Sequence, residues 1–306
     1  MKKSILHKVA LVIAGLVIAM TAIKAQPATV TVAGVPGGTL DKFVTGTAGE
    51  DPDLATKGTK VAYLVYPDAI LNPTWAPGVD AKNTTGLTTN FTWAVPAAFS
   101  STFVPASNTI HYVTMTVDGT AGATGNITVV ENSASACSGS TTTMAVKVVA
   151  QPTASAASVT DGSAPLTSIC ASGTNGSLNV ALPTFNVTKT FDAAITTPNL
   201  RIKADLVFTD LTTGLPTTLF TNVILNVDAV TGDVNAADLA AAVPGGKFNS
   251  WGTYKLVVNT ISDKISRKDL NAAGGFFAVA GVSATYSVFK TPTTGPIYHV
   301  VNNNSL

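Results

Sequence analysis

The sequence predicts an all-β protein made of antiparallel β-sandwiches, and three observations indicate this class. Short segments of alternating apolar and polar residues recur along the chain, as in residues 91–95 and 199–208. Turn-forming sequences such as Asp118-Gly119 separate these segments. Charged residues make up only 11% of the chain, so hydroxyl and amide side chains must cover much of the surface. Short alternating strands between turns are typical of a sandwich.

The first half of the chain contains the segments that most clearly indicate strands. Residues 91–95 place Phe91, Trp93 and Val95 on one face, and Pro96 ends the strand. Further strands are expected at 60–66, 109–117, 126–130 and 143–149, with a looser candidate at 29–35. Small polar residues from Pro152 to Pro165 then indicate a short linker.

The second half repeats this pattern. Residues 199–208 alternate apolar side chains with Arg201, Lys203 and Asp205, which predicts a strand with one buried face and one solvent-exposed face. Further strands are expected at 178–182, 219–227, 253–260, 263–270 and 283–289. One short helix is predicted over residues 235–242, with Asn235 as its N-cap.

The first residues predict export. Lys2, Lys3 and Lys8 precede an apolar run over residues 9–20, which is shorter than the ~20 residues that a membrane-spanning helix needs. Residues 1–25 are therefore expected to be a signal peptide, and the mature chain is expected to have no membrane span. The protein is then secreted or held at the cell surface, with the periplasm as the alternative.

Length and charge set the organisation. A chain of 306 residues is long enough for two cores, so we expect one sandwich over residues 26–152 and a second over 153–306. The formal net charge is +1, and the mature part has no basic run. This balance argues against a nucleic-acid partner.

The two cysteines, Cys137 and Cys170, sit in similar Ser/Gly/Ala-rich surroundings. In an exported protein they are candidates for a disulfide between the two halves of the chain. The alternative is two free thiols, since the sequence does not give their geometry. Their spacing does not match a metal site.

Several segments resemble the PKD-like, immunoglobulin-like repeats of secreted and surface proteins from Bacteroidetes-type bacteria. These segments are Phe91-Thr92-Trp93-Ala94-Val95-Pro96, residues 126–130, Ala136-Cys137-Ser138-Gly139-Ser140 and, in the second half, Ile169-Cys170-Ala171-Ser172-Gly173. The resemblance implies two tandem immunoglobulin-like antiparallel β-sandwich domains and an extracellular compartment. It implies fold more than function.

Candidates for catalysis or metal binding are few. His111 and His299 are the histidines that remain after removal of the signal peptide, and no nucleophile-elbow motif occurs. A calcium loop starting at Asp228 would place Val230 and Gly232 where oxygen ligands are needed. We therefore predict no catalytic residues, no cofactor and no metal, and the protein is expected not to be an enzyme.

Two tryptophans are candidate ligand contacts. Trp75 lies in a Pro/Gly-rich loop, and Trp251 lies between predicted turns and a strand. Each could stack on a carbohydrate, and the alternative for Trp75 is a side chain folded over the end of the sandwich.

The C-terminal segment contains one more candidate strand. Pro292 and Pro296 precede a short apolar run, which consists of Ile297, Tyr298, His299, Val300 and Val301. Either this run is the last edge strand of its own domain, or it is offered to the open sheet edge of a neighbouring copy.

Together these features predict a non-enzymatic structural or interaction protein of the cell surface or extracellular matrix. Its expected partners are other surface or matrix proteins or glycans, and self-assembly would proceed through the C-terminal strand. The first alternative is an adhesin module that binds carbohydrate or protein. The second is a secreted hydrolase.

Overall fold

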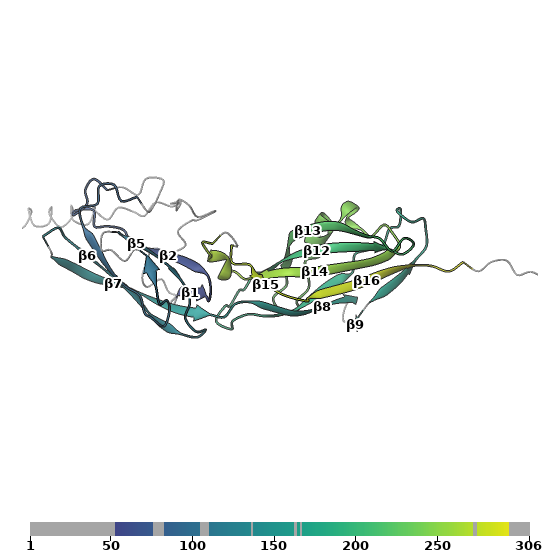
Figure 1. The fold of residues 1–306 in the computed structure, drawn as a ribbon, viewed down its shortest axis with the longest axis horizontal. Helices are drawn as coiled ribbons and strands as arrows, with labels where there is room; N and C mark the ends of the chain where they lie inside the picture. The colour runs from purple at the N-terminus through teal and green to yellow at the C-terminus, as the bar shows by residue number, and fades with distance from the viewer. Residues whose placement is uncertain are drawn as a thin grey trace, which may run out of the picture. The chain divides into compact units, whose positions relative to one another are not determined.

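The computed structural model describes residues 53–75, 83–104, 110–135, 137–161, 164–165, 167–271 and 274–293. By its internal contacts the chain divides into two compact units. Unit 1 comprises Met1–Gln151 and Lys268–Gly275, and unit 2 comprises Pro152–Arg267 and Phe276–Leu306. The secondary structure of both is dominated by strands, which confirms the all-β class (Figure 1).

Unit 1 is a sandwich of two sheets, with strand orders β1-β7-β6-β3 and β2-β5-β4. Neighbouring strands run antiparallel except β1, which runs parallel to the last residues of β7. This is the arrangement of an immunoglobulin-like sandwich. The strands are β1 (Asp53–Thr56), β2 (Lys60–Leu64), β3 (Asn90–Ala94), β4 (Phe103–Val104), β5 (Tyr112–Thr116), β6 (Thr124–Asn132) and β7 (Ser138–Val149).

The core of unit 1 follows from the alternation of its strands. Phe91 of β3, Val113 of β5 and Val146 of β7 are fully buried, and Phe99 from the β3–β4 connection joins them. The strands predicted at 60–66, 91–95, 109–117, 126–130 and 143–149 are confirmed in type. β7 begins at Ser138 and is longer than expected, because it pairs with β6 almost to the turn between them.

Unit 2 contains a larger sheet, of order β10-β16-β14-β12-β13 with β15 added beside β14, and a smaller sheet of order β11-β8-β9. Its strands are β8 (Thr153–Asp161), β9 (Ala164–Pro165), β10 (Ser168–Ala171), β11 (Thr184–Thr190), β12 (Leu200–Asp210), β13 (Pro216–Val227), β14 (Gly252–Ser262), β15 (Phe277–Ala278) and β16 (Ser283–Lys290). Short helices are α2 (Ala236–Ala242), η1 (Pro244–Gly246) and η2 (Ser266–Lys268).

Stacked aromatic rings lie at the centre of the unit 2 core. The rings of Phe248 and Tyr254 are 3.7 Å apart between centroids and only 12° from parallel, and Tyr286 lies 6.0 Å from Phe248. The Tyr254 hydroxyl donates a hydrogen bond to the carbonyl of Ser250 at 2.9 Å. Burial raises the pKa of Tyr254, so this hydroxyl keeps its proton at neutral pH.

The single helix prediction is confirmed. α2 begins at Ala236, and the Asn235 side chain accepts hydrogen bonds from the backbone N–H groups of Ala237 and Asp238. This is the N-cap geometry that satisfies the otherwise unpaired donors of the first helical turn. The strands predicted at 199–208, 219–227, 253–260 and 283–289 correspond to β12, β13, β14 and β16.

Three local predictions were wrong. The expected linker after Pro152 is strand β8, whose small side chains Ala154 and Ala157 pack against the core instead of marking a flexible segment. Residues 178–182 form only an isolated bridge between Val180 and Phe248. Residues 263–270 form a turn and η2, because the Asp263 carboxylate accepts the backbone N–H of Ser266 at 2.6 Å.

Replacing Phe248 by Ala is expected to lower the free energy of unfolding by about 3–5 kcal/mol, since it removes a buried ring from the stack on Tyr254. Urea unfolding monitored by Tyr and Trp fluorescence measures the change. Val230→Ala is the control, because Val230 is 88% exposed and its truncation should change stability by less than about 0.5 kcal/mol. Equal effects of the two substitutions would contradict this assignment of the core.

Candidate functional site

One end of unit 1 brings together the β2–β3 and β6–β7 connections. The last residue of β2, Leu64, lies opposite Tyr112, the first residue of β5. Asn90 at the start of β3 lies opposite Asn132 at the end of β6, which in turn pairs with Ser138. Loops at the end of a sandwich are free to vary without disturbing the sheets, so this loop end is a natural place for recognition.

A buried polar network fixes the β2–β3 connection to β6. The carboxylate of Glu131 accepts hydrogen bonds from the backbone N–H of Asp68 at 2.9 Å, the side-chain amide of Asn72 at 2.8 Å and the hydroxyl of Thr89 at 2.6 Å. The Asn72 carbonyl oxygen in turn accepts from the backbone N–H groups of Thr88 and Thr89. Asn72 and Thr89 are buried, and a satisfied network of this kind holds its members in one arrangement.

This network presents two apolar side chains to solvent. The Asp68 carboxylate accepts the backbone N–H groups of Ile70 at 2.7 Å and Leu71 at 3.0 Å, which closes a tight turn. Ile70 is 78% exposed and Leu71 is 42% exposed. We call residues 68–72 the presenting turn. A turn that is anchored by buried polar groups and carries exposed apolar side chains is well suited to contact a partner.

The aromatic side chains near this turn support it from within. Trp75 is only 5% exposed, and its indole N–H donates to the carbonyl of Asn83 at 2.6 Å. The centre of its ring lies 5.5 Å from the ring centre of Tyr66 and 5.3 Å from that of the fully buried His111, and both pairs are in edge-to-face geometry. Burial raises the pKa of Tyr66. This geometry favours the packing interpretation of Trp75, and ligand contact through it stays a prediction.

A small polar pocket adjoins the same connection. It has a volume of about 350 Å³ and is lined by Thr84, Leu87, Thr88, Thr89, Asn90 and Ile110. The lining offers hydroxyl and amide groups and contains no ionisable side chain. It can therefore hold water or a hydroxyl group, but its lining provides no acid, base or nucleophile activated by a base.

β7 has an open edge next to this loop end. β1 pairs only with residues Val146 to Val149 of β7. The N–H and C=O of Val148 bond to Ala123 and Gly122 on the β6 side, so even-numbered residues of this strand face β6. Thr141, Thr143 and Ala145 therefore turn their N–H and C=O groups to the other side, where no described strand pairs with them.

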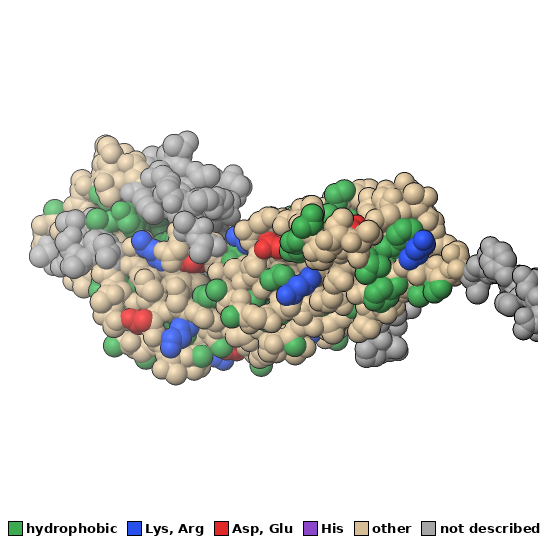
Figure 2. All heavy atoms as spheres, turned by 45° about the vertical axis from the view of Figure 1, so that its right-hand side comes forward, with side chains coloured by type: hydrophobic (Ala, Val, Ile, Leu, Met, Phe, Trp, Pro, Cys, Tyr) green, Lys and Arg blue, Asp and Glu red, His purple; other side chains and the backbone are tan. Residues whose placement is uncertain are grey.

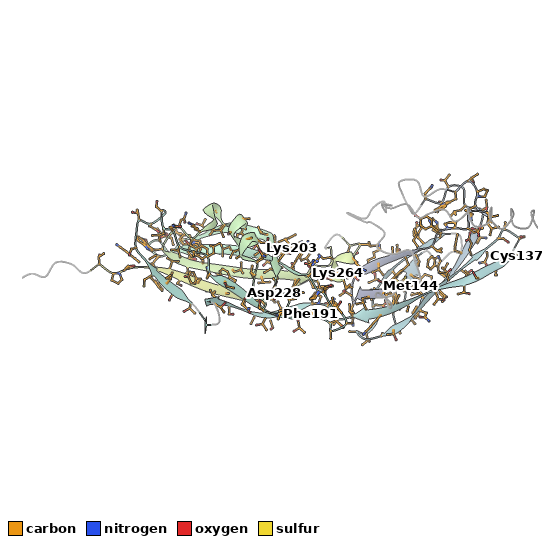
Figure 3. All side chains as sticks on the ribbon, turned by 180° about the vertical axis from the view of Figure 1, so that it is seen from behind. Cys137, Met144, Phe191, Lys203, Asp228 and Lys264 are labelled. Carbon is orange, nitrogen blue, oxygen red and sulfur yellow. The ribbon has the colours of Figure 1, made fainter. Side chains whose placement is uncertain are left out.

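This open edge, residues 138–145, lacks two of the usual protections against pairing with another chain, because it contains no charged residue and no proline. Its register with β6 shifts once between Ser138 and Thr141 and is regular from Thr141 to Val146. Figure 3 shows Met144 along this hairpin and Cys137 at its tip. The long edge strand β13 of unit 2 is different, because it has two register shifts and its Asn222 adopts a φ of 51° with its N–H bonded to Asp205.

The other residues singled out by the sequence lie in unit 2 or outside the described residues. Trp251 is half-buried, its indole N–H donates to the carbonyl of Ala171 at 3.0 Å, and the Lys290 amine lies 5.4 Å from its ring centre. Ligand contact through Trp251 stays a prediction. The predicted C-terminal strand, residues 297–301, lies outside the described part of the chain, as do the predicted strand at 29–35 and the predicted signal peptide over residues 1–25.

Cys137 and Cys170 are exposed and free in the structure, and they belong to different units. Cys137 lies in the connection between β6 and β7, and Cys170 lies in the short edge strand β10. The free-thiol alternative therefore describes this structure, and a bridge between the two cysteines stays a prediction.

The loop considered for calcium is a hydrogen-bonded turn. The Asp228 carboxylate accepts the backbone N–H groups of Val230 and Thr231, which lowers the pKa of Asp228, and the Lys189 amine donates to the Val230 carbonyl. Within the described residues, no group of three or more His, Cys, Asp or Glu side chains is placed to hold a metal ion.

The described part of the chain also contains no helix that is long and apolar enough to cross a membrane.

The fold defines an all-β protein with immunoglobulin-like sandwich architecture. A scan against protein-family models matches no family, and a search of curated proteins finds no match. Among solved structures, the chain is similar to the fibronectin(III)-like modules of CbhA from Clostridium thermocellum, with 14% identity, a TM-score of 0.31, and coverage of 83% of this chain and 97% of that chain.

Two further solved structures are similar to a comparable extent. For three N-terminal domains of the outer capsid protein Hoc of bacteriophage RB49, identity is 11%, the TM-score is 0.29, and coverage is 78% of this chain and 67% of that chain. For the EC1-2 domains of human protocadherin-24, identity is 12%, the TM-score is 0.25, and coverage is 80% of this chain and 97% of that chain. TM-scores this low do not establish a relationship, and the resemblance to PKD-like repeats stays a prediction.

Removal of the Glu131 carboxylate tests the anchoring of the presenting turn. Glu131→Ala is expected to destabilise unit 1 by about 1–3 kcal/mol, because buried Asn72 and Thr89 each lose a hydrogen-bond partner. Amide hydrogen exchange should accelerate over residues 68–72 and remain slow in the strands. Thr128→Ala on the same strand is the control. Unchanged exchange in the turn would show that the network does not hold it.

Proposed function

We propose that the protein is an exported, non-enzymatic structural component of the cell surface or extracellular matrix that assembles from copies of itself. The C-terminal strand of one copy, residues 297–301, adds to the open edge of β7 in the next copy. The observation that carries this proposal is the open edge of β7. It contains no charged residue and no proline, and its register is regular from Thr141 to Ala145, so it is a template for another strand.

The chemistry of the two segments is compatible. Thr141, Thr143 and Ala145 offer three N–H and three C=O groups along the open edge. A five-residue strand covers about 17 Å and the eight residues of the edge about 26 Å, at ~3.3 Å per residue. Backbone hydrogen bonds would supply the pairing, and the apolar side chains of the added strand would cover the half-exposed Met144.

The position of the added strand in the sequence determines the kind of assembly. It belongs to the C-terminal end of the chain, and the edge that it joins belongs to unit 1. A contact between two different surfaces is heterologous, so repetition of it gives rings or fibres. This is the behaviour of a structural protein, and it requires no catalytic residue.

Truncation after Lys290 is expected to abolish assembly. Light scattering of the chain from Gln26 onward, over a concentration series, should show large species for the full chain and a monomer for the chain ending at Lys290. Circular dichroism of the truncated chain checks that it remains folded. If both chains are folded monomers, a monomeric binding module is the better assignment, and a glycan panel with Trp251→Ala would then test the adhesin alternative.

Thr143→Pro in the full chain tests the open edge itself. The N–H of Thr143 points away from β6, so proline removes a donor from the open side without breaking a bond to β6. We expect loss of assembly with unchanged secondary structure, whereas Thr143→Val, which keeps the N–H, should assemble as the unmodified chain does. Full assembly of the proline variant would rule out this edge as the acceptor. The edge could be occupied by the chain's own N-terminal residues instead of a second copy. A shortened chain that lacks residues 26–52 distinguishes these two occupants.

A further inference from the structure

Apolar side chains form a row at one end of the larger sheet of unit 2. The register aligns Asp210 of β12, Gly252 of β14 and Val288 of β16. The next row consists of Leu211, Trp251 and Phe289, and the N–H of Leu211 donates to the carbonyl of Trp251 at 3.1 Å. This row therefore runs across the ends of three adjacent strands.

Two of the three side chains in this row, Leu211 and Phe289, face solvent. Phe289 is three positions from the buried ring of Tyr286, so the alternation of β16 places it on the opposite face of the sheet. Trp251 is half-buried and packs against the unit 2 core. Leu211 is 50% exposed and Phe289 is 42% exposed, and Leu215 in the adjoining β12–β13 turn is 67% exposed. We call Leu211, Leu215, Trp251 and Phe289 the end patch. Figure 2 shows hydrophobic side chains gathered at the end of unit 2 where β16 finishes.

The turn that carries the two leucines is held in place. The Asp210 carboxylate accepts the backbone N–H groups of Thr212 and Thr213, and the Asn175 amide donates to it as well. These hydrogen bonds lower the pKa of Asp210, so the turn keeps an ionised cap at neutral pH. Exposed apolar side chains on an ordered turn are a marker of an interface.

The C-terminal segment starts beside this patch. The backbone N–H of Thr291 donates to the carbonyl of Ala171, the same carbonyl that accepts the indole N–H of Trp251. Residues 291–296 separate β16 from the predicted strand, and six residues span at most about 21 Å. A partner that binds residues 297–301 therefore contacts the chain within about 21 Å of the end of β16.

Unit 1 carries a complementary surface at the end where the open edge lies. The presenting turn exposes Ile70 and Leu71, next to the acidic Asp68. The end patch has the basic Lys290 at its rim, with its amine 5.4 Å from the ring of Trp251. Apolar surfaces of similar kind with opposite charges beside them favour association in one orientation.

We propose that the end patch of unit 2 docks on the presenting turn of unit 1 in the next copy of the chain. This inference rests on the proposed head-to-tail assembly and identifies a second contact within it. Strand addition supplies backbone hydrogen bonds that almost any extended segment could make. The end patch adds side-chain contacts that select a second copy as the partner and fix its orientation.

Charge substitutions in the full-length mature chain test the docking. Leu211→Asp and Ile70→Lys should each raise the concentration at half-assembly by about tenfold or more, since each puts a charge into an apolar contact. The double variant should recover most of the loss, because the two new charges would face each other between neighbouring copies. Analytical ultracentrifugation measures the concentration at half-assembly for the two single variants and the double variant.

Val230→Asp is the matched control, because it introduces the same charge at an exposed valine in the β13–α2 connection. If Leu211→Asp assembles as Val230→Asp does, the end patch is not an interface. If the single substitutions weaken assembly and the double variant shows the full sum of both losses, the patch and the turn do not contact each other. If Thr143→Pro abolishes assembly while one of these two results is obtained, only the docking is overturned. If the unmodified chain is a monomer, the proposed function is overturned as well.

Discussion

The outer side of β7 in unit 1 is paired by a described strand over only part of its length. β1 runs parallel to β7 from Val146 to Val149 and satisfies its backbone groups there. From Ala145 back to the turn, the outward N–H and C=O groups are paired by no described residue. Backbone groups at a sheet edge are obligatory hydrogen-bonding groups, so they bond either to water or to another strand. This constraint is the basis for the proposal that β7 accepts a further strand.

Two hydrogen-bonded turns, one in each unit, expose apolar side chains. The presenting turn is ordered because Glu131 and Asn72 use their polar atoms on backbone and hydroxyl donors, which leaves Ile70 and Leu71 to solvent. In unit 2, Asp210 performs the same task for the turn that carries Leu211. In both places a carboxylate caps a turn and orders its backbone, and the turn exposes apolar side chains. Their exposure is the basis for the proposed contact between copies.

Much of the fold could be predicted because alternation and capping are local. Residues 199–208 required a half-buried strand, and Asn235 required a helix start, since both depend on neighbours within a few positions. The strand β8 could not be predicted in this way, because Ala154 and Ala157 look like linker residues until a facing sheet buries them. The turn at Asp263 was missed because the capture of the Ser266 N–H competes with strand pairing, and the pattern of residues does not show which prevails.

The sequence by itself determined the all-β class and most strand positions, because these follow from residue type and period. Only the tertiary structure decided that Trp75 is buried, that Thr141, Thr143 and Ala145 face outward from an edge that no described strand pairs, and that Leu211, Trp251 and Phe289 form one row. These properties depend on which strands pair and in what register. Register joins residues far apart in the chain, so no local pattern contains it.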